Sequence, residues 1–241
     1  MTARDLDPAA RKLWLSIRDE VSAMATAARD AERVRGVIAA RHTASQRFFA
    51  SSAGQWDRLR EELFGSRTEL YPLLGLLDRA AVVGDLGCGA GQLAEAMAPF
   101  VARVIAVDES SAMLRAARAR LDAFDNVDFR HGTLETLPVD EEELDVALLS
   151  LVLHYVAEPQ LALSNTSRAL KRGGRLLLVD MLPHDRAEYR ETMGHLWQGF
   201  SHQQLERWTT DVGLVDFRAH ALPASPAAKG PTLFVASCTK P

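Results

Sequence analysis

Apolar residues follow different patterns in the two parts of the chain. Residues 8–77 are rich in Ala, Arg and Glu and show few patterns typical of strands, and from Ile17 to Ala31 apolar residues recur every three to four positions, as they do on one face of a helix. From about Ala80 onward, short β-branched runs alternate with helical patterns. We therefore predict an α-helical N-terminal extension over residues 1–77 and an α/β domain over residues 78–241.

The extension is predicted to begin with a helix that Asp7 caps and Pro8 opens. One face of this helix carries an apolar stripe, made of Ile17, Val21, Met24, Ala28 and Ala31. The stripe packs either onto the protein's own core or against a second copy, which would make a homodimer. We expect Gly36 to interrupt the helix and Ile38–Ala50 to form a second one.

The α/β part contains five strands that alternate with helices, predicted at Ala81–Leu86, Arg103–Val107, Val127–Arg130, Leu144–Leu149 and Arg175–Asp180. Helical patterns fill Gln92–Ala98, the segment after Ser110 and Glu158–Leu170. This alternation predicts a doubly wound parallel sheet, because parallel strands need crossover connections.

The last two predicted strands, Leu214–Ala219 and Leu233–Ser237, follow a helix that Ser201 caps. The segment Ala221–Pro231 between them has no helical pattern, so we predict a hairpin loop and an antiparallel last strand. The predicted fold is a Rossmann-like, seven-stranded doubly wound sheet with a terminal antiparallel hairpin, preceded by the helical extension.

Composition excludes several classes of protein. The net charge of −4 gives no general attraction for nucleic acid or anionic membranes. The two cysteines, Cys88 and Cys238, lie far apart and form no C-x-x-C pair, so a reducing, cytoplasmic location is expected. Residues 1–11 lack an apolar signal core, and no apolar run approaches the roughly 20 residues that a membrane helix needs.

A glycine-rich turn follows the first predicted strand, with Gly87, Gly89 and Gly91 in G-x-G-x-G spacing after Asp85. Glycines let the backbone turn sharply and approach a ligand, although such a turn can also be only structural. The spacing differs from the G-x-G-x-x-G of dinucleotide-binding proteins. The negative charge of Asp85 suits the cationic end of S-adenosylmethionine (SAM) better than a phosphate.

Asp108 ends the second predicted strand, where an acidic residue can bind both ribose hydroxyls of a nucleoside. The turn after the third strand should border adenine, and the end of the fourth strand should face the methionine part. The predicted cofactor contacts are Trp56, Asp85, Gly87, Cys88, Gly89, Gly91, Asp108, Glu109, Met113, Gly132, Thr133, Leu134, Glu135, Ser150 and Leu151.

Residues 41–239 resemble the class I SAM-dependent methyltransferases, and most closely the module that is fused to ArsR-type winged-helix regulators. The segments that carry the resemblance are 45–49, 56–57, 85–89, 148–154, 180–186 and 189–200. Thr133 departs from the pattern, because the family usually has Asp there, and no winged-helix pattern precedes the module. The resemblance implies a SAM-dependent methyltransferase (EC 2.1.1) that releases S-adenosylhomocysteine (SAH). Its N-terminal segment implies a lid formed by Phe48, Phe49 and Trp56, with the alternative that Phe48 and Phe49 only anchor the helix to the core.

A small-molecule acceptor is expected beyond the carboxyl ends of the fourth and fifth strands. His154 and His184 are the candidate catalytic bases, and His154 can alternatively be bonded only to backbone. The predicted acceptor contacts are Tyr155, Asp180, Arg186, Tyr189 and His195. His184 and Arg186 either bind an anion or pair with Asp185 and Glu188.

The sequence argues against a metal site and against arsenic methylation. The histidine spacings predict no metal site. Arsenic methylation is not expected, since Cys88 lies in the cofactor turn and leaves only Cys238 for arsenic. The alternative to an enzyme is a SAM- or SAH-binding sensor that works with a transcriptional regulator.

Overall fold

The chain forms two compact units, Met1–Thr68 and Glu69–Pro241. The computed structural model describes residues 7–64, 71–223 and 228–241. Within these ranges, no helix combines the length and the apolar character that crossing a membrane requires. The domain boundary predicted at residue 77 stays a prediction.

The first unit is helical, as predicted. Its elements are α1 (Pro8–Ala23), α2 (Ala25–Ser52), η1 (Ala53–Gln55) and α3 (Trp56–Phe64). Asp7 caps α1, because its Oδ1 accepts the backbone N–H groups of Ala9 at 2.9 Å and Ala10 at 3.0 Å. These bonds satisfy donors that have no partner inside the helix.

Two expectations about the first unit are wrong. The helix is interrupted at Met24, where the backbone is extended, and α2 runs through Gly36 without a break. One glycine costs a helix only about 1 kcal/mol relative to alanine, which the rest of α2 can offset. The apolar stripe therefore lies on two helices and not on one, with Ile17 and Val21 in α1. Nothing in the sequence explains the break at Met24.

The second unit contains a seven-stranded sheet with helices. In chain order the elements are α4 (Tyr71–Leu74), β1 (Val82–Leu86), α5 (Gln92–Met97), η2 (Ala98–Phe100), β2 (Arg103–Asp108), α6 (Ser111–Arg120), β3 (Val127–His131), β4 (Leu144–Ser150), η3 (Leu153–Tyr155), α7 (Pro159–Ala169), β5 (Leu170–Met181), α8 (Glu188–Met193), α9 (His202–Asp211), β6 (Val215–Ala221) and β7 (Leu233–Thr239). The strand order is β3-β2-β1-β4-β5-β7-β6. Strand β7 runs antiparallel to both β5 and β6, so the predicted hairpin is confirmed.

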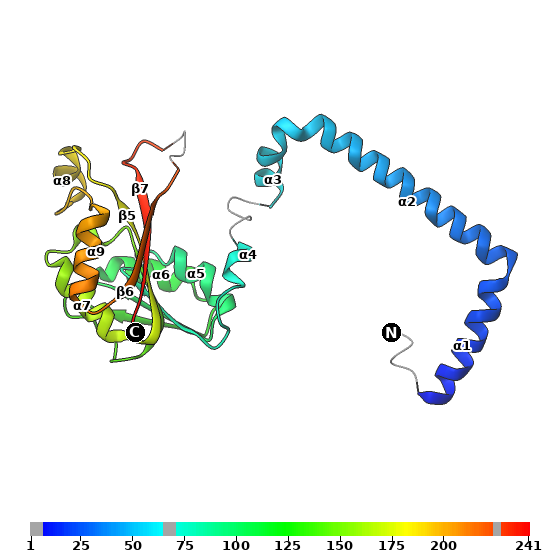
Figure 1. Ribbon diagram of the computed structural model, residues 1–241, viewed down its shortest axis with the longest axis horizontal. Coiled ribbons are helices and arrows are strands. Elements are labelled where there is room, and N and C mark those ends of the chain that lie inside the picture. The colour runs from blue at the N-terminus through cyan, green and yellow to red at the C-terminus, as the bar shows by residue number, and fades with distance from the viewer. Residues whose placement is uncertain (1–6, 65–70, 224–227) are drawn as a thin grey trace. The chain divides into compact units, whose positions relative to one another are not determined.

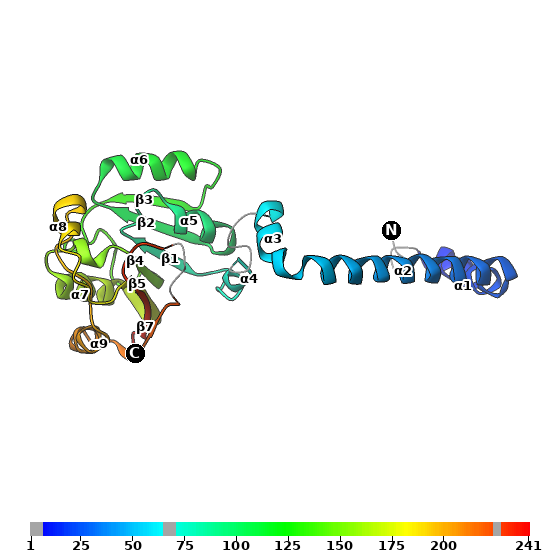
Figure 2. The same ribbon diagram turned by 90° about the horizontal axis from the view of Figure 1, so that it is seen from above.

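Helices cover both faces of the sheet. Figure 1 shows α7 and α9 on one side and α5 and α6 on the other, and Figure 2 shows the same unit from above. Successive side chains of a strand point to opposite faces. Val104 accordingly packs into the core beside α5, and Ile105 packs into the core on the α7 side. This alternation is what a doubly wound sheet requires.

The structure corrects two details of the second unit. Strand β5 begins at Leu170 and not at Arg175, so it also contains Gly173 and Gly174. The pairing with β4 shifts register between Leu144 and Val146, and this irregularity accommodates the extra residues of β5. Helix α8 lies in a connection that the helical pattern did not reveal.

Candidate functional site

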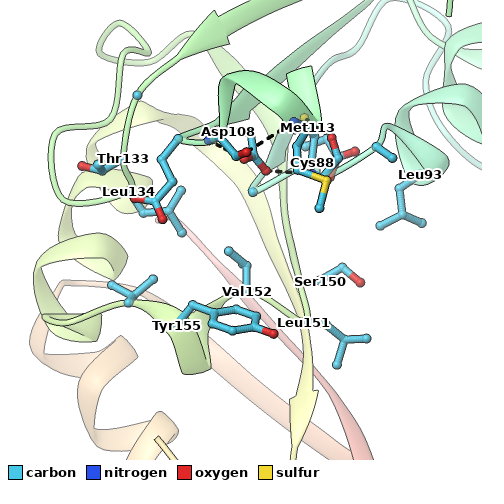
Figure 3. A pocket seen from close by; sticks show the side chains of 18 of the residues that line it. Cys88, Leu93, Asp108, Met113, Thr133, Leu134, Ser150, Leu151, Val152 and Tyr155 are labelled. Atoms are coloured by element: carbon cyan, nitrogen blue, oxygen red, sulfur yellow. Dashed lines mark hydrogen bonds between the residues drawn. The ribbon is translucent and has the colours of Figure 1, made fainter. Parts of the chain in front are cut away.

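A cavity of about 640 Å³ lies at the carboxyl ends of β1, β2 and β4. The strand order reverses between β1 and β4, since β2 and β3 extend to one side and β5 to the other. Such a switch point leaves a crevice between the loops that leave the two strands, which is where open α/β sheets bind ligands. In Figure 3, Cys88, Asp108 and Met113 face Val152, Leu151 and Tyr155 across this first cavity.

At two positions of the glycine turn, the structure explains why the residue is glycine. Gly87 has φ +79°, and a Cβ there would lie 2.3 Å from Val152 Cγ2, so a side chain is excluded. Gly89 has φ +53° with open space where its Cβ would be. The turn is fixed by the backbone N–H groups of Gly87 and Cys88, which donate to Val107 O at 2.8 and 2.9 Å. The backbone at Gly89 is thus left open to a ligand.

Asp108 holds the same turn from the neighbouring strand. Its Oδ2 accepts the Gly89 N–H at 2.8 Å, and its Oδ1 accepts the Ser110 N–H at 2.8 Å (Figure 3). Ser110 in turn caps α6 by accepting the Met113 N–H at 3.3 Å. A carboxylate offers about four acceptor positions, so Asp108 keeps capacity for ribose hydroxyls.

Carboxylates dominate the charge of the first cavity. Asp85, Asp108, Glu109 and Glu135 line it. Arg120 also lines it, but its Nη1 is paired with Glu95 Oε2 at 3.0 Å. Such a lining favours a cationic ligand.

Burial changes the protonation of two groups in the glycine turn. Desolvation raises the pKa of Asp85 to about 7, although the Ala94 N–H that bonds its Oδ2 opposes the shift. Desolvation and the charges of Asp85 and Asp108 raise the pKa of the Cys88 thiol to about 12. The Cys88 thiol therefore stays protonated and is no nucleophile near neutral pH.

Most of the predicted cofactor residues lie in the first cavity. The lining includes Asp85, Gly87, Cys88, Gly89, Asp108, Glu109, Met113, Gly132, Thr133, Leu134, Glu135, Ser150 and Leu151. Gly91 does not line it; a Cβ there would lie 2.9 Å from Leu121 Cδ1, so Gly91 permits close packing of α5 against α6. Trp56 belongs to α3 in the first unit, and its side chain lies outside the described residues.

Sequence reasoning missed several lining residues. Gln92 and Leu93 open α5, and Val152 and Val156 flank η3. Met193 comes from α8 and had no signal, because α8 itself was not predicted. Thr133 Oγ1 lies 2.9 Å from Thr136 Oγ1 and accepts the Thr136 N–H at 3.1 Å, so this side chain stabilises its own turn.

A second cavity of about 460 Å³ adjoins the first. Leu151, Tyr155 and Met193 line both cavities. Leu151 has φ +54°, a left-handed conformation that is strained for a residue with a branched side chain. Its N–H donates to Val179 O at 2.8 Å, which holds this conformation. Strain of this kind concentrates at functional sites.

The second cavity collects several of the residues predicted to contact an acceptor. His154, Tyr155, Tyr189 and His195 line it. His154 is buried, and its Nδ1 lies 2.9 Å from Oδ1 of the fully buried Asp180. The prediction that Asp180 contacts the acceptor directly does not fit this burial, because its carboxylate has no exposed surface.

His184 and Arg186 line neither of the two cavities. Nδ1 of His184 accepts the Arg186 N–H at 3.2 Å. Nη1 of Arg186 lies 3.9 Å from Glu188 Oε1. The contact of Arg186 with Glu188 matches the local pairing that the sequence left open as an alternative to anion binding, whereas His184 bonds the backbone of Arg186 and not Asp185 or Glu188.

Residues 84–178, which contain the glycine turn, Asp108 and the β4 end, match the profile of a family described as a methyltransferase domain. This part of the chain is similar to methyltransferase domains. The cofactor that the sequence predicts for such a domain is SAM. The first cavity fits that cofactor, because it combines the open Gly89 backbone with a carboxylate lining for a sulfonium cation.

Two curated relatives and one solved structure illustrate the similarity. Over 136 residues the chain is 32% identical to demethylmenaquinone methyltransferase of Clavibacter sepedonicus, which covers 55% of this chain and 56% of that protein. Over 91 residues it is 37% identical to a ubiquinone biosynthesis O-methyltransferase of Ruegeria, covering 37% of each. A SAM-dependent methyltransferase structure from Mesorhizobium loti superposes with a TM-score of 0.59 at 20% identity, covering 70% of this chain and 96% of that one, and shows the same fold.

The chain spans about half of the Clavibacter protein and less of the Ruegeria protein. The similarity therefore concerns only part of each relative. These relatives give no support for the predicted resemblance to modules that are fused to ArsR-type regulators.

Proposed function

We propose that the chain transfers the methyl group of SAM to a small-molecule acceptor held in the second cavity. The observation that carries this proposal is the common wall of the two cavities, formed by Leu151, Tyr155 and Met193. A methyl donor and an acceptor must meet in one closed space, since positioning supplies much of the rate of a displacement. When bound, SAM supplies the activated methyl group.

The cofactor contacts are assigned by the same proposal. Asp108 binds the ribose, Gly132–Glu135 border the adenine, and Ser150 and Leu151 face the methionine part. The carboxylates of the first cavity support this orientation, because they favour a cation over the phosphates of a dinucleotide.

Compounds of quinone biosynthesis are the first acceptors to test. The names of the two relatives refer to demethylmenaquinone and to ubiquinone biosynthesis. A largely apolar second cavity suits such ring compounds. A cytoplasmic location is part of the proposal, since Cys88 and Cys238 are both free thiols.

The test is incubation of the full chain with methyl-labelled SAM and cell extract, followed by mass spectrometry of labelled products. We expect one or a few labelled small molecules, and SAH in equal amount. Binding of SAM without any labelled product would contradict an enzyme and favour a sensor that works with a transcriptional regulator.

A further inference from the structure

The second cavity contains a buried histidine–aspartate pair beside an apolar lining. His154 is 3% exposed and Asp180 is fully buried. Oδ1 of Asp180 also accepts the backbone N–H of Met181 at 2.8 Å, so the carboxylate cannot turn away from the histidine. The two residues are 26 positions apart, and they meet because β4 and β5 are neighbours in the sheet.

This pairing determines which histidine nitrogen is free. A carboxylate accepts hydrogen bonds, so Nδ1 of His154 carries the proton and donates it to Asp180. Nε2 then carries the lone pair, and no hydrogen bond from the described part of the chain uses it. Because His154 lines the second cavity, this lone pair is the base available to a bound acceptor.

Asp180 and His195 flank the imidazole ring of His154. Oδ2 of Asp180 is buried and has no hydrogen-bond partner among the described residues. The His195 ring lies 4.3 Å from the His154 ring, centroid to centroid. Burial and the neighbouring His154 and His184 lower the pKa of His195, which therefore stays neutral and does not repel a proton on His154.

The other lining residues indicate what kind of molecule would use this base. Besides the histidines and tyrosines they are mostly apolar, and include Met181, Leu222 and Leu233. The described lining contains no Lys, Arg, Asp or Glu side chain. An acceptor with a full charge would lose its hydration there without gaining a partner. The cavity therefore favours a neutral, mostly apolar molecule.

Resting on the proposed function, we infer that His154 is the general base for a neutral hydroxyl group of an apolar ring compound, with Asp180 as its positioning residue. The acceptor O–H gives its proton to Nε2 of His154. The oxygen lone pair forms the new bond to the methyl carbon, and the carbon–sulfur bond breaks with its electrons going to sulfur, which leaves SAH. A base is needed because a phenol, like the tyrosine side chain with a pKa of about 10, is almost entirely protonated at neutral pH.

The first experiment tests the tautomer and does not depend on turnover. In the full chain with SAH, nitrogen-15 NMR of labelled histidine should show His154 protonated at Nδ1 and free at Nε2. Asp180→Asn should change the ratio of the two tautomers, because an amide can also donate to the ring. A His154 that carries its proton on Nε2 in the wild type would overturn the inference.

The second experiment uses 4-nitrophenol as the probe. The probe is added to the full chain with bound SAH, and the absorbance of the ionised phenol is measured as a function of pH. Bound probe should ionise at a lower pH than free probe. The shift should disappear in His154→Gln and remain in His220→Gln, which alters an exposed histidine of β6. The groups around His154 that also titrate are Asp180, Tyr155, His184 and His195. Absence of probe binding, or a shift that survives in His154→Gln, would overturn the inference.

Labelled product formation separates this inference from the proposed function. His154→Gln should lower it by about 10²- to 10⁴-fold, the usual contribution of a general base. The variant should still bind SAH in calorimetry, and this binding would show that it is folded. If the wild type forms no product, the proposed function fails; if His154→Gln forms product at the wild-type rate, only the assignment of the base fails.

Discussion

At the scale of single residues, Asp108 connects the stability of the glycine turn to cofactor binding. Its two oxygens accept the N–H groups of Gly89 and Ser110, and the remaining acceptor positions are those proposed for the ribose. Asp108→Ala should weaken SAM binding by about 1.5–3 kcal/mol, the range for lost hydrogen bonds to a charged group. Calorimetry measures this difference, and NAD should show no binding.

Asp122→Ala is the matched control, because it removes an exposed carboxylate in the loop after α6. Its SAM affinity should equal that of the wild type. An unchanged affinity in Asp108→Ala would mean that Asp108 does not contact the ribose. A micromolar affinity for NAD would contradict the cofactor assignment.

Asp85 makes stability depend on pH. Its pKa in the folded chain is about 7, above the ordinary value of 3.8, so the folded state binds a proton more tightly than the unfolded state. The contribution of Asp85 to the free energy of unfolding therefore falls as pH rises from about 4 to about 7. Asp85→Asn should remove this loss and gain up to about 4 kcal/mol by pH 8, since each pKa unit corresponds to about 1.4 kcal/mol.

Urea unfolding of both proteins between pH 4 and pH 8 measures the effect. The difference between variant and wild type isolates Asp85, because the other groups titrate alike in both. A difference that does not change with pH would show that Asp85 ionises normally in the folded chain. The same substitution should weaken SAM binding above pH 7, where the wild-type carboxylate is charged.

At the scale of elements, the apolar residues of the first two helices lack cover within their own unit. Ile17 and Val21 are each 47% exposed and Met24 is 50% exposed. If a second copy covers them, light scattering should report a dimer. Val21→Glu combined with Met24→Glu should then produce folded monomers, since burying two carboxylates in an apolar interface is costly.

Thr26→Glu combined with Arg29→Glu is the control for this pair, because both positions are exposed and polar at the start of α2. This variant should stay dimeric. A wild type that is monomeric at high protein concentration would show that a second copy does not cover the stripe.

At the scale of the whole molecule, the core belongs to the second unit. Every described residue that is buried and hydrophobic lies at Ala81 or later in the chain. A fragment of residues 69–241 should therefore unfold cooperatively. Its SAH affinity should match that of the full chain if the first unit contributes no contact, and calorimetry decides. A weaker affinity would support the contact predicted for Trp56, whereas a fragment that does not fold would show that the core is incomplete.

The sequence by itself determined the features that depend on neighbouring residues. Asp7, Ser110 and Ser201 each cap the helix that follows, as local hydrogen bonding predicts. The alternation of strand and helix patterns fixed the class of sheet, and the lack of a helical pattern before Leu233 gave the antiparallel β7. These features need only short-range contacts and the periods of helices and strands.

Only the tertiary structure decided which distant residues meet. The sequence proposed His154 and Asp180 for one site but could not pair them, since their contact depends on the register between β4 and β5. It also placed Gly91 in the cofactor site, whereas the packing of Leu121 against it explains that glycine. The common wall of the two cavities, with Met193 from the unpredicted α8, is likewise a product of packing. Contacts between residues far apart in the chain leave no period in the sequence, and so they become visible only when the sheet is assembled.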